Sequence, residues 1–347
     1  MIHYKIGYNF DETLIKVIND LNSRSEGAII DSVYGSVSVL DRYTVRPKHR
    51  LPDIAMNTLG LHIQKLHESN IRFSYALNAT YIGSKAEIYD KQKLLLSEIE
   101  RLIDNGIDDV IVSHPYIAML IRNRYNIPIA ISSATNIFSV NQMQYLHDEF
   151  GCRSFCLAPS FNRKIRMLEK MQVCLNSLQS HIELIVNELC CLGFNNGKSV
   201  APCIFRESCF DCHSENKTQN NDDLLEGYPQ RICTGSRDRM QSASWAKAPV
   251  IRPEDIKKYS SIGIHYFKIT GRTADTDALT AVLKGYMNFD YTGSVSHLWY
   301  MKGNTLGIDN KKLDGFLNHW FEDRNHDCDS ELCGTTCKYC DDFFEAS

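Results

Sequence analysis

Short runs of β-branched and aromatic residues alternate with longer amphipathic stretches over most of the chain. In the first such stretch Leu14, Ile18 and Leu21 recur at helical spacing. This alternation predicts βα units around a parallel sheet. The expected strands are Tyr4 to Tyr8, Gly27 to Val33, Ile71 to Leu77, Asp109 to Ser113, Ile127 to Ser132, Ser154 to Ala158, His181 to Val186 and Tyr266 to Ile269. The expected helices are Asp11 to Leu21, Leu51 to Glu68, Lys91 to Asn105, Tyr116 to Tyr125, Val140 to Phe150, Arg163 to Ser177 and Asp275 to Tyr286.

The number of expected strands, eight, is the number that closes a (β/α)8 barrel, whose active residues lie on loops at the C-terminal ends of the strands. The rival is an open doubly wound sheet, but no G-x-G-x-x-G follows the first expected strand to support it. We therefore expect an α/β, TIM-barrel-like fold over residues 1–289. A Cys-rich insertion at 187–247 precedes the last strand, and a small Cys-rich extension occupies 290–347.

Charge and hydropathy narrow the class of protein. The formal net charge of -4 gives no broad basic surface for nucleic acid, although an RNA substrate stays open. No stretch reaches the roughly 18 apolar residues of a spanning helix, and Met1 to Leu14 lacks the apolar centre of a secretion signal. We expect a cytoplasmic protein without a membrane partner.

Cysteine usage points to metal chemistry. Thirteen cysteines, an odd number, without a secretion signal favour metal-binding or redox thiolates over a disulfide framework. Cys152, Cys156 and Cys174 lie in apolar or mixed surroundings and are expected to be ordinary buried residues. The other ten form two groups, which are Cys190, Cys191, Cys203, Cys209, Cys212 and Cys233, and then Cys328, Cys333, Cys337 and Cys340.

The last four cysteines give the pattern C-x4-C-x3-C-x2-C within thirteen residues. Four thiolates so close together can converge on one metal centre, and Gly334 allows the turn around it. Zinc and a 4Fe-4S cluster both accept four thiolates, so the spacing does not choose between them.

The earlier group is larger than one metal centre needs, because six cysteines compete for about four ligand positions. Cys190 follows the expected strand His181 to Val186 directly, at the end where a barrel carries its active residues. Arg206 and His213 lie among these thiols, where they either contact sulfur or substrate or simply keep the surface polar.

Three runs resemble a known family: I-E-L-I-V-N-E-L-C (Ile182 to Cys190), A-P-C-I-F-R-E-S-C (Ala201 to Cys209) and V-I-R-P-E-D-I-K-K-Y-S-S-I-G-I-H-Y-F-K-I-T-G-R-T (Val250 to Thr273). They are similar to the collagenase-like peptidases, which are peptidase family U, number 32. When weaker similarities elsewhere in the chain are included, the resemblance spans most of Tyr4 to Tyr286. It implies a barrel-like fold in which four cysteines hold a 4Fe-4S cluster. It also implies oxygen-independent hydroxylation of a tRNA uridine, an rRNA cytidine or the ubiquinone ring, with prephenate as oxygen donor.

Carried over residue by residue, the resemblance implies a set of cluster ligands. The first follows the seventh expected strand, the second lies in a C-x-x-R context with Arg206, and the third precedes the I-R-P-E-D run. These ligands are Cys190, Cys203 and Cys233, with Cys209 or Cys212 as the fourth. The longer spacer after Cys190 and the extra C-x2-C pair depart from the family pattern.

Lys268 and Arg272 match the family's F-K-I-x-G-R element. A fixed guanidinium at the end of a barrel strand suits bidentate binding of a carboxylate, which prephenate would supply. Glu188 is a further candidate for positioning the acid or the target. The alternative is that Arg272 only pairs with a nearby acid such as Asp275 or Asp277.

Three kinds of function remain. The first is an iron–sulfur oxidoreductase that hydroxylates a small molecule, a peptide or an RNA base. The second is a peptidase, as the family name says, although neither H-E-x-x-H nor G-x-S-x-G occurs. The third is a non-catalytic iron–sulfur subunit that passes electrons to a homologous partner chain or stabilises it.

Overall fold

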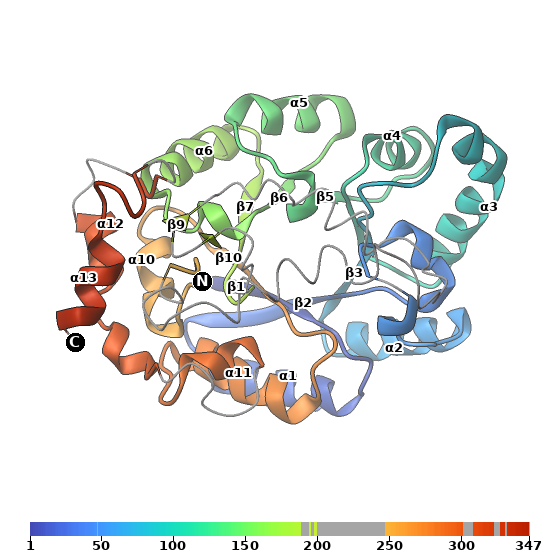
Figure 1. Ribbon diagram of the computed structural model, residues 1–347. Helices are drawn as coiled ribbons and strands as arrows, with labels where there is room; N and C mark the ends of the chain where they lie inside the picture. The colour runs from blue at the N-terminus through green and yellow to red at the C-terminus, as the bar shows by residue number, and fades with distance from the viewer. Residues whose placement is uncertain are drawn as a thin grey trace, which may run out of the picture.

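Eight parallel strands close into a barrel in the computed structural model, which describes residues 1–46, 48–188, 194–195, 198–199, 247–300, 308–322, 327–329 and 332–346. The strand order around the barrel is β1-β10-β7-β6-β5-β4-β3-β2, with helices outside it (Figure 1). The barrel strands are β1 (Ile2–Gly7), β2 (Ala28–Gly35), β3 (Arg72–Leu77), β4 (Asp109–Val112), β5 (Ile129–Ile131), β6 (Ser154–Leu157), β7 (His181–Ile185) and β10 (Tyr266–Ile269). All eight expected strands are confirmed, and with them the TIM-barrel-like fold.

Helices follow the barrel strands as the sequence pattern predicts. They are α1 (Thr13–Arg24), α2 (Met56–Glu68), α3 (Lys85–Asp104), α4 (Pro115–Arg124), α5 (Val140–Phe150), α6 (Ile165–Ser177), α10 (Ile256–Ser260) and α11 (Thr276–Asn288). The short α10 was not expected, because five residues are too few to show a helical period. A short antiparallel pair, β8 (Phe194–Asn195) and β9 (Lys198–Ser199), lies within the insertion.

Local sequence signals set several helix ends. Helix α3 begins six residues before its expected start, because Ser84 and Glu87 form a capping box there. Helix α5 ends as expected at Gly151, whose φ of 69° is a left-handed conformation that glycine adopts without strain. The carboxylate of Asp11 accepts a hydrogen bond from the Thr13 N–H at 2.9 Å, so α1 starts two residues after the position expected.

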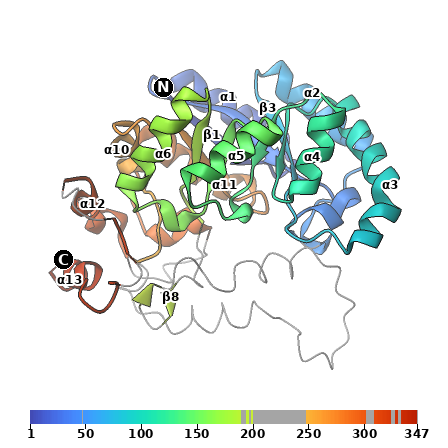
Figure 2. The ribbon, with the colours of Figure 1, turned by 90° about the horizontal axis from the view of Figure 1, so that it is seen from above.

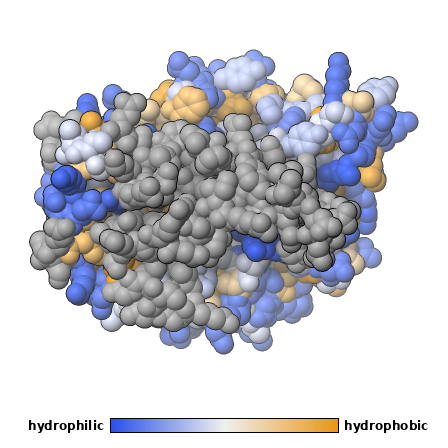
Figure 3. Space-filling view, in the orientation of Figure 1, coloured by the Kyte–Doolittle hydropathy of each residue, from blue (hydrophilic) through white to orange (hydrophobic). Residues whose placement is uncertain are grey.

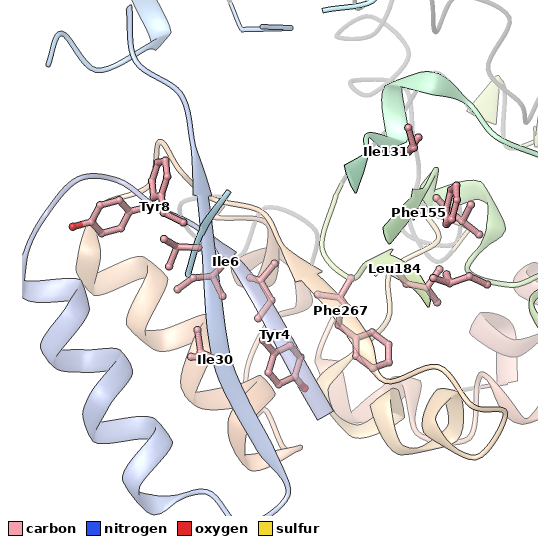
Figure 4. Packing of buried hydrophobic residues seen from close by; sticks show 14 of the residues in the cluster. Tyr4, Ile6, Tyr8, Ile30, Ile131, Phe155, Leu184 and Phe267 are labelled. Carbon is pink, nitrogen blue, oxygen red and sulfur yellow. The ribbon is translucent and has the colours of Figure 1, made fainter. Parts of the chain in front are cut away.

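The main hydrophobic core lies between the strands and the surrounding helices. Tyr4, Ile6 and Phe267 are fully buried in it, and Figure 4 shows such side chains gathered on this side of the strands. Because successive strand residues point to opposite faces, alternate positions such as Lys5 and Lys268 point into the barrel. Polar side chains therefore occupy much of its interior.

The C-terminal segment packs against the barrel on the side of α6 and α10 (Figures 1 and 2). Its described parts include α12 (Asn318–Glu322) and α13 (Tyr339–Ala346), together with the 3-10 turns Val295–Trp299 and Asn310–Leu313. Arg252 anchors it, because its buried guanidinium pairs with Asp255 at 2.8 Å and with Asp314 at 2.9 Å. In this structure the I-R-P-E-D run thus ties the extension to the barrel.

The two ends of the barrel are well separated. Figure 2 shows the N-terminus at one end and β8, which follows β7, at the other. Hydrophilic and hydrophobic residues are interspersed on the described surface in Figure 3. Among the described helices, none is both long and apolar enough to cross a membrane.

Candidate functional site

The segment after β10 is fixed at the mouth of the barrel, where the strands end. Asn187, which follows β7, accepts the backbone N–H of Thr270 at 2.8 Å through its Oδ1 and donates to the Leu298 carbonyl at 2.9 Å. The Tyr300 hydroxyl donates to the Thr270 carbonyl at 2.6 Å. These bonds hold the backbone that leads to Arg272 in one conformation.

Two glycines allow the close packing of this segment. A Cβ on Gly7, at the end of β1, would lie 2.5 Å from the backbone nitrogen of Arg272. A Cβ on Gly271 would lie 2.5 Å from the Tyr300 ring, and its φ of +132° is also unfavourable for other residues. The position of Arg272 therefore depends on glycine at both sites.

The guanidinium of Arg272 has polar neighbours but no acidic partner among the described residues. Its Nη1 donates to the Ser36 hydroxyl at 2.9 Å. Burial and the neighbouring charge of Arg46 lower the pKa of Arg272 to about 9. Asp275, one of the two alternative partners expected for it, instead caps α11 by accepting the Ala278 N–H at 2.8 Å.

Lys268 is buried and stands one residue before the end of β10. Its ammonium lies 3.7 Å from Glu183 Oε2 and 3.9 Å from the centre of the Tyr34 ring. The other carboxylate oxygen of Glu183 is 3.3 Å from Lys5 Nζ. All three charged residues are at least nine-tenths buried. Burial alone would raise the pKa of Glu183, but the two lysines lower it to about 2.

Sequence reasoning had missed Lys5 and Glu183. Each is a charged residue at a position of a predicted strand flanked by aliphatic or aromatic neighbours, as in Y-K-I and I-E-L. In a buried strand such a charge usually has a partner, so this pattern was the available signal.

Glu188 follows Asn187 at the end of β7 and is partly exposed. The predicted cluster ligands, which come later in the sequence, lie outside the described residues, so their role stays a prediction. They are Cys190, Cys203, Cys209, Cys212 and Cys233. Cys152 and Cys156 are buried, which raises the pKa of each thiol to about 12, as expected for structural cysteines.

The four cysteines of the extension share one small module. The backbones of Cys333 and Cys337 form an isolated β-bridge across a turn. In this turn the Gly334 N–H donates to the Cys337 carbonyl at 2.9 Å. The pKa of Cys340 is raised to about 12 by burial and by the neighbouring thiols of Cys328 and Cys333. In the described part of the chain, no three His, Cys, Asp or Glu side chains are placed to hold a metal ion. Four thiols are suitable ligands for zinc or for a cluster. Their positions in this structure, however, are not those of ligands gathered around one metal centre.

Comparison with known proteins gives a family match. The profile of Peptidase family U32 matches residues 26–290, which contain seven of the eight barrel strands entirely. An uncharacterized protease of Methanocaldococcus jannaschii is 24% identical over 298 residues, which are 83% of this chain and 80% of that protein.

Among solved structures, a U32 peptidase is similar over 67% of this chain and 84% of its own, at 12% identity and a TM-score of 0.48. An aldolase from Escherichia coli K12 is similar over 72% of this chain and 85% of its own, at 8% identity and a TM-score of 0.33. Likeness at this level says nothing about what the chain binds.

Proposed function

The chain belongs to peptidase family U32, and from that premise we propose that it is an iron–sulfur enzyme that hydroxylates its substrate without dioxygen. Its co-substrate in this proposal is a small organic acid, with prephenate as the expected compound. The observation that carries the proposal is the guanidinium of Arg272, which stands at the barrel mouth without an acidic partner among the described residues.

Two guanidiniums at the mouth favour an anionic ligand. Arg46 is close enough to Arg272 to lower its pKa, so the two positive charges repel each other in the free protein. A ligand with two carboxylates, as prephenate has, would neutralise both and accept charge-assisted hydrogen bonds from them. Ser36 orients the Arg272 guanidinium toward such a ligand.

The other residues of the site have supporting roles in this proposal. Asn187 and Tyr300 keep the Arg272 segment rigid, which lowers the entropic cost of binding. Glu188, at the end of β7, would position the target molecule. Lys268, whose ammonium lies over the Tyr34 ring, would help to position the acid or the target from inside the barrel.

The proposed cofactor of the barrel is a 4Fe-4S cluster held by Cys190, Cys203 and Cys233, with Cys209 or Cys212 as fourth ligand. Such a cluster supplies electron transfer when it is bound. The family resemblance and the position of Cys190 just after β7 support this assignment. We propose a second metal, zinc or a 4Fe-4S cluster, at Cys328, Cys333, Cys337 and Cys340.

Replacement of Arg272 by lysine tests the proposal, because lysine keeps the charge but lacks the planar fork. Arg272→Lys should lower prephenate affinity by roughly tenfold or more. The measurement is anaerobic calorimetry with prephenate, together with iron content and circular dichroism, which should stay near wild type. Arg124→Lys, on the exposed end of α4, is the matched control. If Arg272→Lys binds prephenate as tightly as Arg124→Lys does, or if the wild-type protein does not bind it, Arg272 is not part of the site.

A peptidase is the second candidate, since the family and its Methanocaldococcus relative carry that name. Release of peptides from gelatin or casein by the purified protein, unaffected by Arg272→Lys, would favour it. A non-catalytic iron–sulfur subunit is the third, and co-purification with a homologous chain would point to it.

A further inference from the structure

A cavity of about 250 Å³ opens at the end of the barrel opposite the mouth. Its walls come from the first residues of the barrel strands and from residues just before them, including Arg72, Arg153 and His181. It is therefore separate from the Arg272 site, which lies where the strands end. A cavity of about 150 Å³ is enough to hold benzene, so this one has room for a somewhat larger molecule.

The lining contains three carboxylates, and each already has a partner. The acids are Asp31, Asp109 and Glu183. The first lies 2.7 Å from Nδ1 of His3, the second accepts the Ser74 hydroxyl at 2.9 Å, and the third is 3.3 Å from the ammonium of Lys5. The carboxylates of the lining therefore give no reason to expect a cationic ligand.

Two arginines line the same cavity, and neither is firmly held. Arg153, just before β6, is exposed, and its guanidinium has no hydrogen bond or ion pair with any described residue. Arg72, the first residue of β3, has a side chain that is 61% exposed and reaches Asp109 only at 3.9 Å. Because both side chains are long and open to water, their guanidiniums can turn toward an anion in the cavity.

The charge of Arg72 also acts on the ring of His181, which lines the cavity. Burial is the main reason why the pKa of His181 falls to about 4, and the positive charges of Lys5 and Arg72 lower it further. Counted with Lys268, which also pairs with Glu183 at 3.7 Å, four cationic side chains stand against the three carboxylates. One positive charge is thus in excess while the histidines are neutral, which favours a ligand with a single negative charge.

The lining also includes apolar side chains. Pro128, Ile129 and Ala130 line the cavity at the start of β5, and Phe267 does so from β10. Ligand pockets typically combine such apolar walls with a few placed polar groups. A ligand that fills this cavity therefore needs an apolar body as well as its charge.

We propose that this cavity binds a small organic monocarboxylate, whose carboxylate accepts hydrogen bonds from the guanidiniums of Arg153 and Arg72 and whose apolar body lies against residues 128–130. A guanidinium fork matches the geometry of a carboxylate and gives it charge-assisted hydrogen bonds. The single negative charge of the ligand offsets the excess positive charge around the cavity. The proposal does not depend on the reaction at the mouth.

The test is binding of benzoate, cyclohexanecarboxylate and hexanoate to the full-length protein at pH 7, by ligand-observed NMR followed by calorimetry. At least one of these acids should bind. Its amide, which has nearly the same shape but no charge, should bind roughly 10-fold more weakly or worse, because it loses the charge-assisted bonds. Acetate, which lacks the apolar body, should also bind roughly 10-fold more weakly or worse.

Three results would overturn the proposal. In the first, none of the three acids binds. In the second, the amide binds as tightly as the acid. In the third, inorganic phosphate binds more tightly than the best of the acids, so that the cavity takes a multiply charged anion without an apolar body.

Variants of the arginines place the ligand. Arg153→Gln removes an exposed guanidinium that has no partner among the described residues, so it should fold normally and still weaken binding by roughly 10-fold. Arg124→Gln, at the exposed end of α4 and outside the cavity lining, is the matched control and should bind like wild type. Unchanged affinity in Arg153→Gln would show that the carboxylate does not lie in this cavity.

The mouth is the other place where a carboxylate could bind, so Arg272→Lys is measured with the same acid. Its affinity should equal that of wild type, because Arg272 lies at the opposite end of the barrel. Binding that is lost in Arg272→Lys and kept in Arg153→Gln would place the acid at the mouth and overturn the proposal.

Discussion

Glu183 joins two lysines inside the barrel, and all three residues are almost fully buried. A buried charge is tolerated only when an opposite charge pairs with it. Loss of the carboxylate therefore leaves two buried ammonium groups without a counter-charge. Glu183→Gln should therefore lower the free energy of unfolding by about 3–5 kcal/mol. Urea unfolding at neutral pH measures this, with the exposed Glu149→Gln as control. A change below about 1 kcal/mol, the range of surface pairs, would mean that water reaches the lysines.

The lowered pKa of His181 predicts that the stability of the protein depends on pH. Burial, with a smaller contribution from Lys5, lowers the pKa of His181 to about 4 from the usual 6.5. Because the folded protein resists protonation, its stability should be complete above pH 6.5 and decline as the pH falls toward 4. The ring of His181 stacks on that of Tyr266, with 3.8 Å between the ring centres, and His181→Phe keeps a ring in this place. The variant should lose the part of the pH dependence of stability that His181 causes.

The readout for His181 is the difference between the two proteins in urea midpoint from pH 7.5 to 4.5. The difference is needed because burial also lowers the pKa of His62 and His265, which titrate in both proteins. Parallel curves for wild type and variant would show that His181 is protonated as easily in the folded state as in the unfolded one.

At the scale of elements, the mouth depends on how closely β1 approaches the segment after β10. A methyl group on Gly7 would lie 2.5 Å from the Arg272 backbone nitrogen, and a backbone atom cannot swing aside as a side chain can. Gly7→Ala should displace the Arg272 segment and weaken prephenate binding by roughly tenfold, while iron content is retained. Calorimetry measures this, and Gly27→Ala, which meets only the Phe289 ring, is the control. Wild-type affinity in Gly7→Ala would contradict a rigid Arg272 segment.

The C-terminal extension is bound to the barrel as an element in its own right. Asp327 caps α6, because its carboxylate accepts the backbone N–H groups of Arg166 at 2.8 Å and Met167 at 3.2 Å. Lys247, at the end of the insertion, pairs with Asp341 at 2.9 Å. A truncation before Asp327 would thus uncap a barrel helix as well as remove the four cysteines.

For the whole molecule, the metal content tests whether the extension is an independent site. Cys333→Ser with Cys337→Ser should remove one metal centre and leave Asp327 in place to cap α6. The visible spectrum of the barrel cluster should persist, because its proposed ligands lie before β10. Iron, sulfide and zinc are quantified after anaerobic purification. An unchanged total metal content would show that the four thiols of the extension bind no metal.

The sequence by itself determined the elements of the barrel and their order, because hydrophobic period, caps and glycine stops act within a few residues. The eight strands and the end of α5 at Gly151 are examples. It also predicted the family, through motifs that are contiguous in the chain.

Only the tertiary structure decided which side chains meet. The partners Lys5, Glu183 and Lys268 come from β1, β7 and β10, and the Ser36 that holds Arg272 is 236 residues away from it. Such contacts depend on strand order and on which face each residue takes in the closed barrel. Local periodicity does not encode these, because they follow from packing the whole chain around one core.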